Sequence, residues 1–191
     1  MDDMRDEYIK AVTVGKGEPF GGEVILENNN PRWRVLFRQE ADKISSALGN
    51  TALQIHHVGS TSVPGLCAKP IIDILLVVAD SSDESSYVPA LESAGYTMHI
   101  REPDWHQHRL LKGSNPDVNL HVFSENAAEI ERMLRFRDWL RSNENDKLCY
   151  ENVKRKLAKR SWAHIQQYAD AKTAIVDEIL ARSQTEKYNT D

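Results

Sequence analysis

A glycine followed by two hydroxyl-bearing residues, Gly59, Ser60 and Thr61, lies at the end of an apolar segment of the chain. Glycine lets the backbone turn with a positive φ and approach a ligand closely. The hydroxyls and the free N–H groups of such a turn can together surround a phosphate. Lys69 adds a mobile cation to the same loop. The pattern predicts a phosphate-binding loop, with an ordinary Gly-Ser turn as the alternative.

One acidic side chain, Asp73, interrupts the most apolar run of the sequence, residues 71–79. An unpaired carboxylate among apolar neighbours is costly, so a metal, Lys69 or a backbone amide must compensate it. Mg²⁺ suits this position because it takes carboxylate and phosphate oxygens together. We therefore expect Asp73 to be the essential acid and to work through a metal, the alternative being that it caps a neighbouring loop.

A histidine on a second predicted strand is the best partner for this acid. Asn119 and His121 alternate with apolar residues and so share one strand face. Histidine binds Zn²⁺, Mn²⁺ or Fe²⁺ as readily as Mg²⁺, and it serves as an acid or base near neutral pH. We expect Asp73 and His121 to be the catalytic pair and to hold one Mg²⁺ or Mn²⁺. His106 and His108, predicted to share a face of another strand, are interpreted as structural.

Arg137, on a predicted C-terminal helix, is a further candidate for binding phosphate, because its guanidinium matches phosphate geometry. The alternative is a structural tie in which Arg137 and Asp138 join the helix to the sheet. Lys172, in the last predicted helix, is a candidate to close over the pocket in the same way. The other basic residues of these helices are interpreted as solvated faces.

Hydrophobic periodicity places these candidates on a mixture of strands and helices. Strands are predicted at residues 23–27, 53–58, 71–79, 97–101, 107–111 and 118–123. Helices are predicted at residues 31–48, 87–94, 127–141, 146–160 and 163–182. The order indicates an α/β (α+β) domain over residues 23–182, with a mixed sheet part at 23–124 and a helical part at 125–182. Residues 1–22 are expected to form a docked arm of low order, and residues 183–191 a polar tail.

The composition is typical of a globular cytoplasmic protein. The net charge of −5 over 191 residues argues against binding to bulk nucleic acid or to an anionic membrane. No apolar run approaches the roughly 20 residues of a membrane span, and the N-terminal residues lack the pattern of a secretory signal. The two cysteines, Cys67 and Cys149, fit neither a metal site nor a disulfide framework. A small-molecule ligand is therefore expected.

Longer motifs resemble those of a known family. Gly59-Ser60 at a strand end, with Asp73 in the next strand, resembles the signature of the nucleotidyltransferase superfamily. The fuller segment His57-Val-Gly-Ser-Thr-Ser-Val-Pro-Gly-Leu with Lys69-Pro-Ile-Ile-Asp73 is more closely similar to the GrpB family. The likeness extends from Glu23 to Ala181 through Asn30-Pro31-Arg32-Trp33, Ala94-Gly95-Tyr96, Glu102-Pro103-Asp104-Trp105-His106, Asn119-Leu120-His121-Val122, Phe136-Arg137-Asp138 and Tyr168-Ala-Asp-Ala-Lys172.

The resemblance implies a nucleotidyltransferase-like fold, a nucleoside triphosphate ligand and transfer of a nucleotidyl or phosphoryl group to a small acceptor. The sequence departs from the superfamily at Leu75, where active members carry a second carboxylate. A two-metal site needs several carboxylates, so this departure favours one metal at most. Two alternatives stay open. One is a non-catalytic nucleotide-binding or sensing module, and the other is a single-metal hydrolase or ligase that uses histidine and Asp73.

Overall fold

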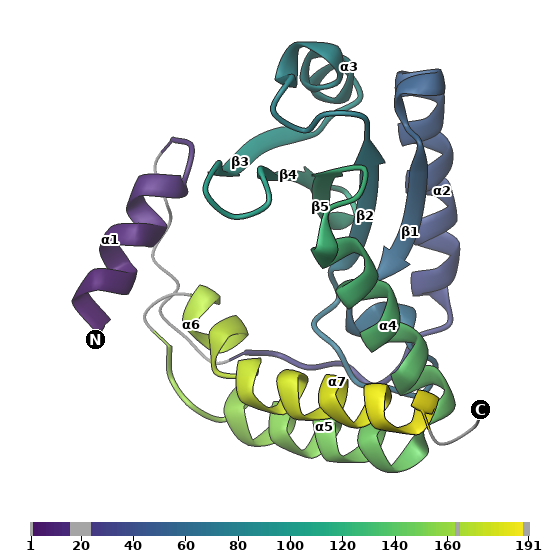
Figure 1. The fold of residues 1–191 in the computed structure, drawn as a ribbon, viewed down its shortest axis with the longest axis vertical. Coiled ribbons are helices and arrows are strands. Elements are labelled where there is room, and N and C mark those ends of the chain that lie inside the picture. Colours follow the sequence, from purple (N-terminus) through teal and green to yellow (C-terminus); the bar gives the residue numbers. More distant parts are fainter. Residues whose placement is uncertain (1, 16–23, 163–164, 189–191) are drawn as a thin grey trace.

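A five-stranded sheet, in the order β1-β2-β5-β4-β3, forms the centre of the molecule (Figure 1). The structure is a computed structural model and describes residues 2–15, 24–162 and 165–188. The strands are β1 (Gln54–Val58), β2 (Ile72–Val78), β3 (Thr97–Glu102), β4 (His108–Ser114) and β5 (Asp117–Ser124). Strands β2 and β5 are parallel, and the other neighbours are antiparallel. The mixed sheet predicted from the sequence is confirmed.

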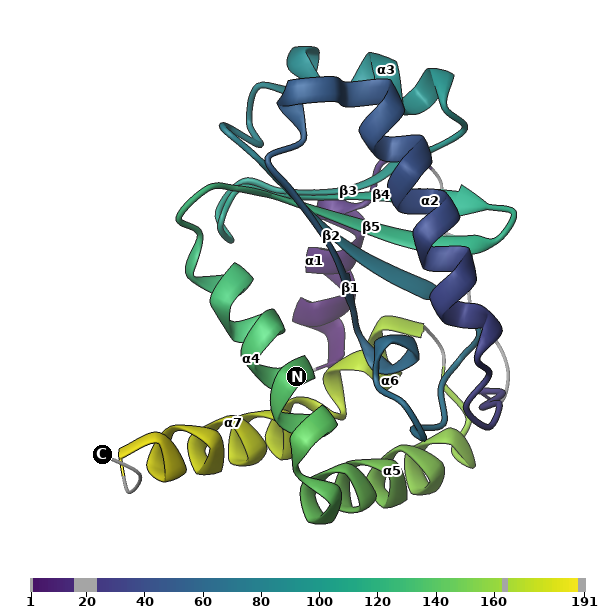
Figure 2. The ribbon, with the colours of Figure 1, turned by 90° about the vertical axis from the view of Figure 1, so that its right-hand side faces the viewer.

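Helices α2 (Arg32–Leu48) and α3 (Val88–Ser93) cover one face of this sheet (Figure 2). Trp33, Ile44 and Leu48 recur at helical spacing along α2 and are buried against alternate residues of the strands. Helix α2 ends at Gly49, whose φ of +53° favours glycine. The periodicity of residues 31–48 therefore predicted this helix correctly.

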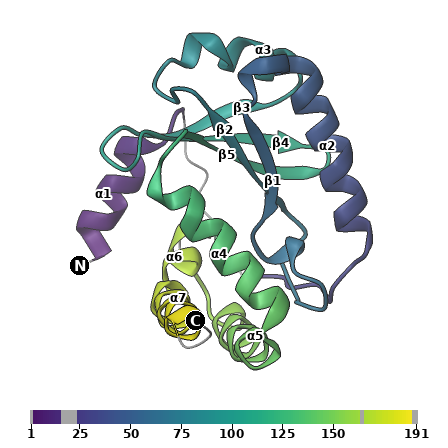
Figure 3. The ribbon, with the colours of Figure 1, turned by 45° about the vertical axis from the view of Figure 1, so that its right-hand side comes forward.

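The opposite face carries the C-terminal helices α4 (Ala128–Ser142), α5 (Glu144–Ala158), α6 (Ile165–Asp170) and α7 (Thr173–Tyr188). Helix α4 lies along this face and buries Leu75 and Phe123 of the sheet. Figure 3 shows α5 and α7 side by side beneath α4, and both also pack on the loop after β1 through Val63 and Leu66. The helical part thereby lies beside the predicted phosphate loop.

The N-terminal part is more regular than the sequence suggested. Residues expected in an arm of low order form helix α1 (Asp2–Val12), in which Lys10 in the last turn complements the helix dipole. The following residues attach to β3, where Thr13 pairs with Ile100. The arm is therefore docked, as expected, but helical. The rest of it, residues 16–22, lies outside the described residues.

The C-terminal helices also differ from prediction. Residues 163–182, expected as one helix, form two helices that break between Asp170 and Thr173, and residues 163–164 lie outside the described part. Helix α7 continues to Tyr188, through most of the expected polar tail, because Ser183 still packs inside the molecule. Residues 189–191 are not described.

Two strand predictions need correction. The short strand expected at residues 23–27 is wrong, because residues 24–26 are irregular and only Glu27 pairs, in a single bridge with Ala68. The strand expected at 107–111 begins one residue later, because His106 and Gln107 have positive φ values of 54° and 51° in a turn. His106 therefore does not share a strand face with His108.

Candidate functional site

Asp73 lies on β2 at the sheet face toward the C-terminal helices, opposite Asn119 in the parallel register with β5. The Asn119 amide donates a 2.7 Å hydrogen bond to Oδ1 of Asp73, and Nε2 of His121 lies 3.9 Å from the same oxygen. Burial by itself would raise the pKa of Asp73. His121, Asn119 and Lys69 outweigh it, so the pKa lies below its ordinary value. The two predicted catalytic residues are thus neighbours.

Gly59 lies directly against this carboxylate. Its φ is +66°, and a Cβ at this position would lie 2.8 Å from both Cβ and Cγ of Asp73 and still closer to Oδ2. The antiparallel pairing of Val58 with Asp73 causes this approach. The glycine is therefore required both by the backbone conformation and by the packing of the acid.

The two hydroxyls after Gly59 have different surroundings. Ser60 is only partly buried and lies near the buried hydroxyl of Tyr150 on α5, at the boundary between loop and helices. Thr61 is buried, and its hydroxyl donates to the Ile71 carbonyl and bonds to His57 at 3.0 Å. Ser60 is therefore the better placed phosphate ligand, whereas Thr61 closes the loop.

Lys69 and Lys172 meet over one aromatic ring. Their Nζ atoms lie 5.6 and 4.6 Å from the ring centre of Tyr168, which is 1% exposed. Burial and, to a smaller extent, the nearby Lys172 lower the pKa of Lys69 to about 8, although Asp73 opposes the shift. Burial likewise lowers the pKa of Lys172. Within the described part of the chain, the Tyr168 hydroxyl has no hydrogen-bond partner.

A third lysine of this region, Lys154 on α5, is buried and donates to the Cys67 carbonyl. Burial lowers its pKa to about 7, and its Nζ lies 5.3 Å from the ring centre of Tyr150. Sequence reasoning missed it by assigning the α5 lysines to a solvated face. The signal was its position four residues after Tyr150 and four before Ala158, both of which are buried.

His121 is also the end of a chain of hydrogen bonds that the sequence did not reveal. Its Nδ1 lies 3.1 Å from Nε2 of His108, whose Nδ1 lies 2.6 Å from Glu102. The hydroxyl of Tyr8 on α1 donates to the other oxygen of Glu102 at 2.6 Å. His108 is therefore buried, which agrees with its interpretation as a structural residue, and it is also hydrogen-bonded to His121 of the candidate site.

Leu75 explains why the second carboxylate is absent. It follows Asp73 on the same strand face, is fully buried, and packs with Val58 and Val77 against Ile130 of α4. An acid here would lie under α4 without water. Among the described residues, no group of three or more His, Cys, Asp or Glu side chains could hold a metal ion. A metal held by Asp73 and His121 would therefore need its remaining ligands from a bound molecule or from water.

Arg137 is occupied by structural contacts. Its guanidinium donates to both oxygens of Asp138 at 2.8 Å and to the His57 carbonyl at 3.2 Å. Arg141, one turn later, donates to the Ser62 carbonyl. These contacts fasten α4 to both ends of the loop, which favours the tie over the phosphate clamp.

Replacing Arg137 by alanine should lower the stability of the ligand-free protein by about 1–3 kcal/mol, because charge-assisted hydrogen bonds are lost. Nucleotide affinity should be unchanged. Chemical denaturation and nucleotide titration of one variant separate the two roles, with Arg38→Ala on the exposed side of α2 as the control. Unchanged stability with weaker nucleotide binding would support the phosphate clamp instead.

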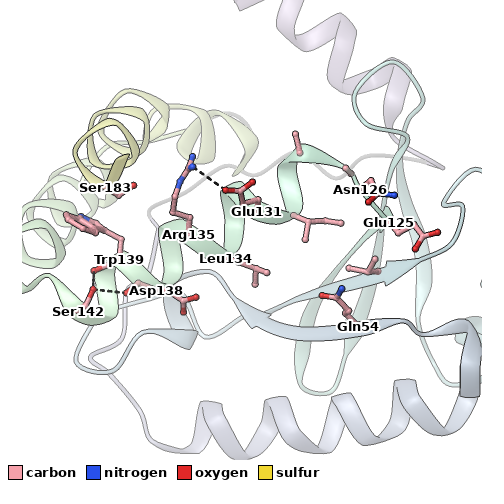
Figure 4. Close-up of a pocket in the computed structure, with 14 residues that line it drawn as sticks. Gln54, Glu125, Asn126, Glu131, Leu134, Arg135, Asp138, Trp139, Ser142 and Ser183 are labelled. Atoms are coloured by element: carbon pink, nitrogen blue, oxygen red, sulfur yellow. Dashed lines mark hydrogen bonds and ion pairs between the residues drawn. The ribbon is translucent and has the colours of Figure 1, made fainter. Parts of the chain in front are cut away.

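A large groove lies away from this site. It has a volume of about 860 Å³ and runs along α4, where Gln54, Glu131 and Arg135 line it (Figure 4). It contains none of the predicted site residues. A smaller cavity of about 180 Å³ is lined by Tyr150, Lys172 and residues of α4, α6 and α7. This cavity, rather than the groove, adjoins the lysine cluster.

The fold and the site define an α/β protein with a Gly-Ser loop packed on a strand carboxylate. A sequence profile described as GrpB protein matches residues 23–182. A UPF0157 protein of Halalkalibacterium halodurans is 60% identical over 178 residues, which cover 93% of this chain and 91% of the relative. The chain therefore belongs to the GrpB family.

Two further comparisons extend this finding. The crystal structure of the conserved protein GrpB from Enterococcus faecalis matches with 29% identity and a TM-score of 0.71, covering 86% of this chain and 99% of that chain. A dephospho-CoA kinase of Mycolicibacterium paratuberculosis is 27% identical over 176 residues, covering 78% of this chain but 43% of the kinase. In the described part of this chain, no helix is long and apolar enough to cross a membrane.

Proposed function

We propose that this protein binds a nucleoside triphosphate or a nucleotide-derived cofactor, with its phosphates between Ser60, Lys69 and Lys172. The main observation behind this proposal is that the two lysines lie together at Tyr168, whose hydroxyl is buried. Neither ammonium group forms a hydrogen bond or ion pair with any described residue, although both lie near Asp73. Partly buried cations without such partners are costly, and a phosphate would satisfy them.

One divalent cation, Mg²⁺ or Mn²⁺, fits the donor set of Asp73 and His121. Asp73 and His121 would offer it a carboxylate oxygen and a ring nitrogen, since Oδ1 of Asp73 and Nε2 of His121 lie 3.9 Å apart. Phosphate oxygens and water would complete the coordination, as is usual for Mg²⁺. The cation would neutralise charge on the phosphates. The likeness to a dephospho-CoA kinase supports a nucleotide-derived ligand.

Transfer of a nucleotidyl or phosphoryl group to a small acceptor is the second candidate function. It is favoured by the position of His121, which can accept a proton beside Asp73. The buried Leu75 argues against two-metal chemistry, because it stands where a second carboxylate would be needed. Two alternative functions therefore stay open, a non-catalytic sensing module and a single-metal hydrolase or ligase. Product analysis with radiolabelled nucleotide distinguishes transfer, hydrolysis and binding alone.

A thermal-shift screen of nucleoside triphosphates and dephospho-CoA, with and without Mg²⁺ and Mn²⁺, tests the binding proposal. A ligand that binds the native state raises the melting temperature. Calorimetric titration of each ligand that gives a shift then supplies its affinity. Absence of binding by every nucleotide, with and without metal, would overturn the proposal.

The variant Lys172→Met should bind the nucleotide about tenfold to a hundredfold more weakly, because a charge-assisted hydrogen bond to phosphate contributes about 1.5–3 kcal/mol. The ligand-free protein should be equally stable or more stable, because the ammonium group is partly buried without an ion-pair partner in the described residues. Lys159→Met, exposed just after the end of α5, is the matched control. Calorimetry and thermal denaturation measure the two effects, and unchanged affinity would contradict this role.

A further inference from the structure

Glu102, His108 and His121 form a continuous line of hydrogen bonds. The binding of a nucleotide does not by itself require this line. Glu102 on β3 contacts His108 on β4, and His108 contacts His121 on β5. The side chains of His108 and Glu102 are 5% and 16% exposed, so water competes little with these contacts. Three neighbouring strands are thus joined by one line of hydrogen bonds that ends beside Asp73.

The hydrogen bonds determine which ring nitrogens carry protons. Glu102 is ionised, since hydrogen bonds from His108 and Tyr8 outweigh its burial and lower its pKa. It can only accept, so Nδ1 of His108 must be the donor. In a neutral His108 ring, a proton on Nδ1 leaves Nε2 as the acceptor in the 3.1 Å contact with Nδ1 of His121. Nδ1 of His121 then carries the proton of that contact, and the lone pair of the neutral His121 ring is on Nε2.

Ring packing fixes the orientation of this line. The His108 ring lies nearly parallel to the ring of His121, at 5.3 Å and 19°, and to the ring of Phe123, at 4.7 Å and 22°. Trp105 meets it edge-on at 5.3 Å. Rotation of His108 would break these contacts together with both hydrogen bonds, so the ring holds His121 in place.

We propose that Glu102 and His108 are positioning residues that fix His121 in its Nδ1–H form and turn the Nε2 lone pair toward a divalent cation on Asp73. This inference rests on the proposed function, because it assigns the ligand of the same site. The arrangement follows a general rule, since a metal-binding histidine usually donates its other N–H to an acceptor that sets its orientation and basicity. Here the acceptor is a second histidine that is itself held by a carboxylate.

The test uses the full chain with ¹⁵N-labelled histidine, free of metal and nucleotide, and long-range ¹H–¹⁵N NMR. In the wild type, we expect the proton of His121 on Nδ1. In Glu102→Gln, the new amide can donate to Nδ1 of His108, which reverses the direction of every bond and moves the His121 proton to Nε2. Titration of Mn²⁺ alone, followed by electron paramagnetic resonance, should show about tenfold to a hundredfold weaker binding in this variant. Glu92→Gln, exposed on α3, should match the wild type in both measurements.

Each result has a distinct meaning. A wild-type His121 protonated on Nε2 would overturn the proposal. This measurement uses the wild type alone, so it remains decisive even if Glu102→Gln fails to fold. A reversed tautomer with unchanged Mn²⁺ affinity would overturn the role in cation binding. Both measurements are made without nucleotide. A failure of nucleotide binding would therefore refute the proposed function, whereas the His121 tautomer and the Mn²⁺ affinity could still be interpreted.

Discussion

The variant Asp73→Asn is expected to lose divalent-dependent nucleotide binding. The amide keeps the shape of the side chain but removes the charge that attracts the cation, and His121 alone would be a weak site. Calorimetric titration of the nucleotide with Mg²⁺ or Mn²⁺ should therefore give at least a tenfold loss of affinity relative to wild type. Metal-independent phosphate affinity should fall less, because the lysines remain.

Stability gives an independent readout for the same variant. The lowered pKa of Asp73 means that the native state favours its ionised form, so this contribution is present above the unfolded pKa and is lost as pH falls through the folded pKa. At pH 7, loss of the charge should therefore destabilise the ligand-free protein. Asp117→Asn, exposed at the start of β5, is the control and should change neither property. Equal metal-dependent affinity in Asp73→Asn and wild type would contradict the metal site.

His121→Ala should resemble Asp73→Asn in milder form, since water can replace one ligand of a hydrated ion.

The sequence predicted Asp73 and His121 as site candidates because both are polar residues within apolar strands, where a polar side chain needs a compensating partner. It also predicted that Gly59 begins the loop. That Gly59 lies on Asp73 could not be predicted, because the contact depends on the antiparallel register of β1 with β2.

The cationic part of the candidate site was predicted only in part, since Lys69 and Lys172 were candidates but Lys154 and Tyr168 were not. Lys154 lies on α5 and Tyr168 on α6, and periodicity does not say how packed helices are arranged. A lysine on an amphipathic helix is usually solvated, so burial of Lys154 became evident only from the packing of α5 against the loop. The line through Glu102 and His108 was missed for the same reason, since it crosses three strands whose order the sequence does not specify.

The second large effect is expected for Gly59→Ala, which should both destabilise the fold and abolish binding. The backbone at Gly59, with φ +66° and ψ −174°, is a conformation in which side chains are strained by about 1–3 kcal/mol. The added Cβ would also lie 2.8 Å from two carbons of Asp73, and relief of such overpacking costs a further 1–3 kcal/mol or so. We expect a total of about 2–6 kcal/mol by chemical denaturation.

A matched glycine separates the two causes of this effect. Gly49 has a φ of +53° and a ψ of −127°, and nothing lies within 4 Å of a Cβ built there. Gly49→Ala should therefore suffer the backbone strain alone and retain nucleotide affinity. Gly59→Ala should lose more stability than Gly49→Ala, and its remaining folded fraction should not bind, because the displaced Asp73 can no longer face His121. If the two variants lose equal stability and both still bind, the close contact between Gly59 and Asp73 has no functional role.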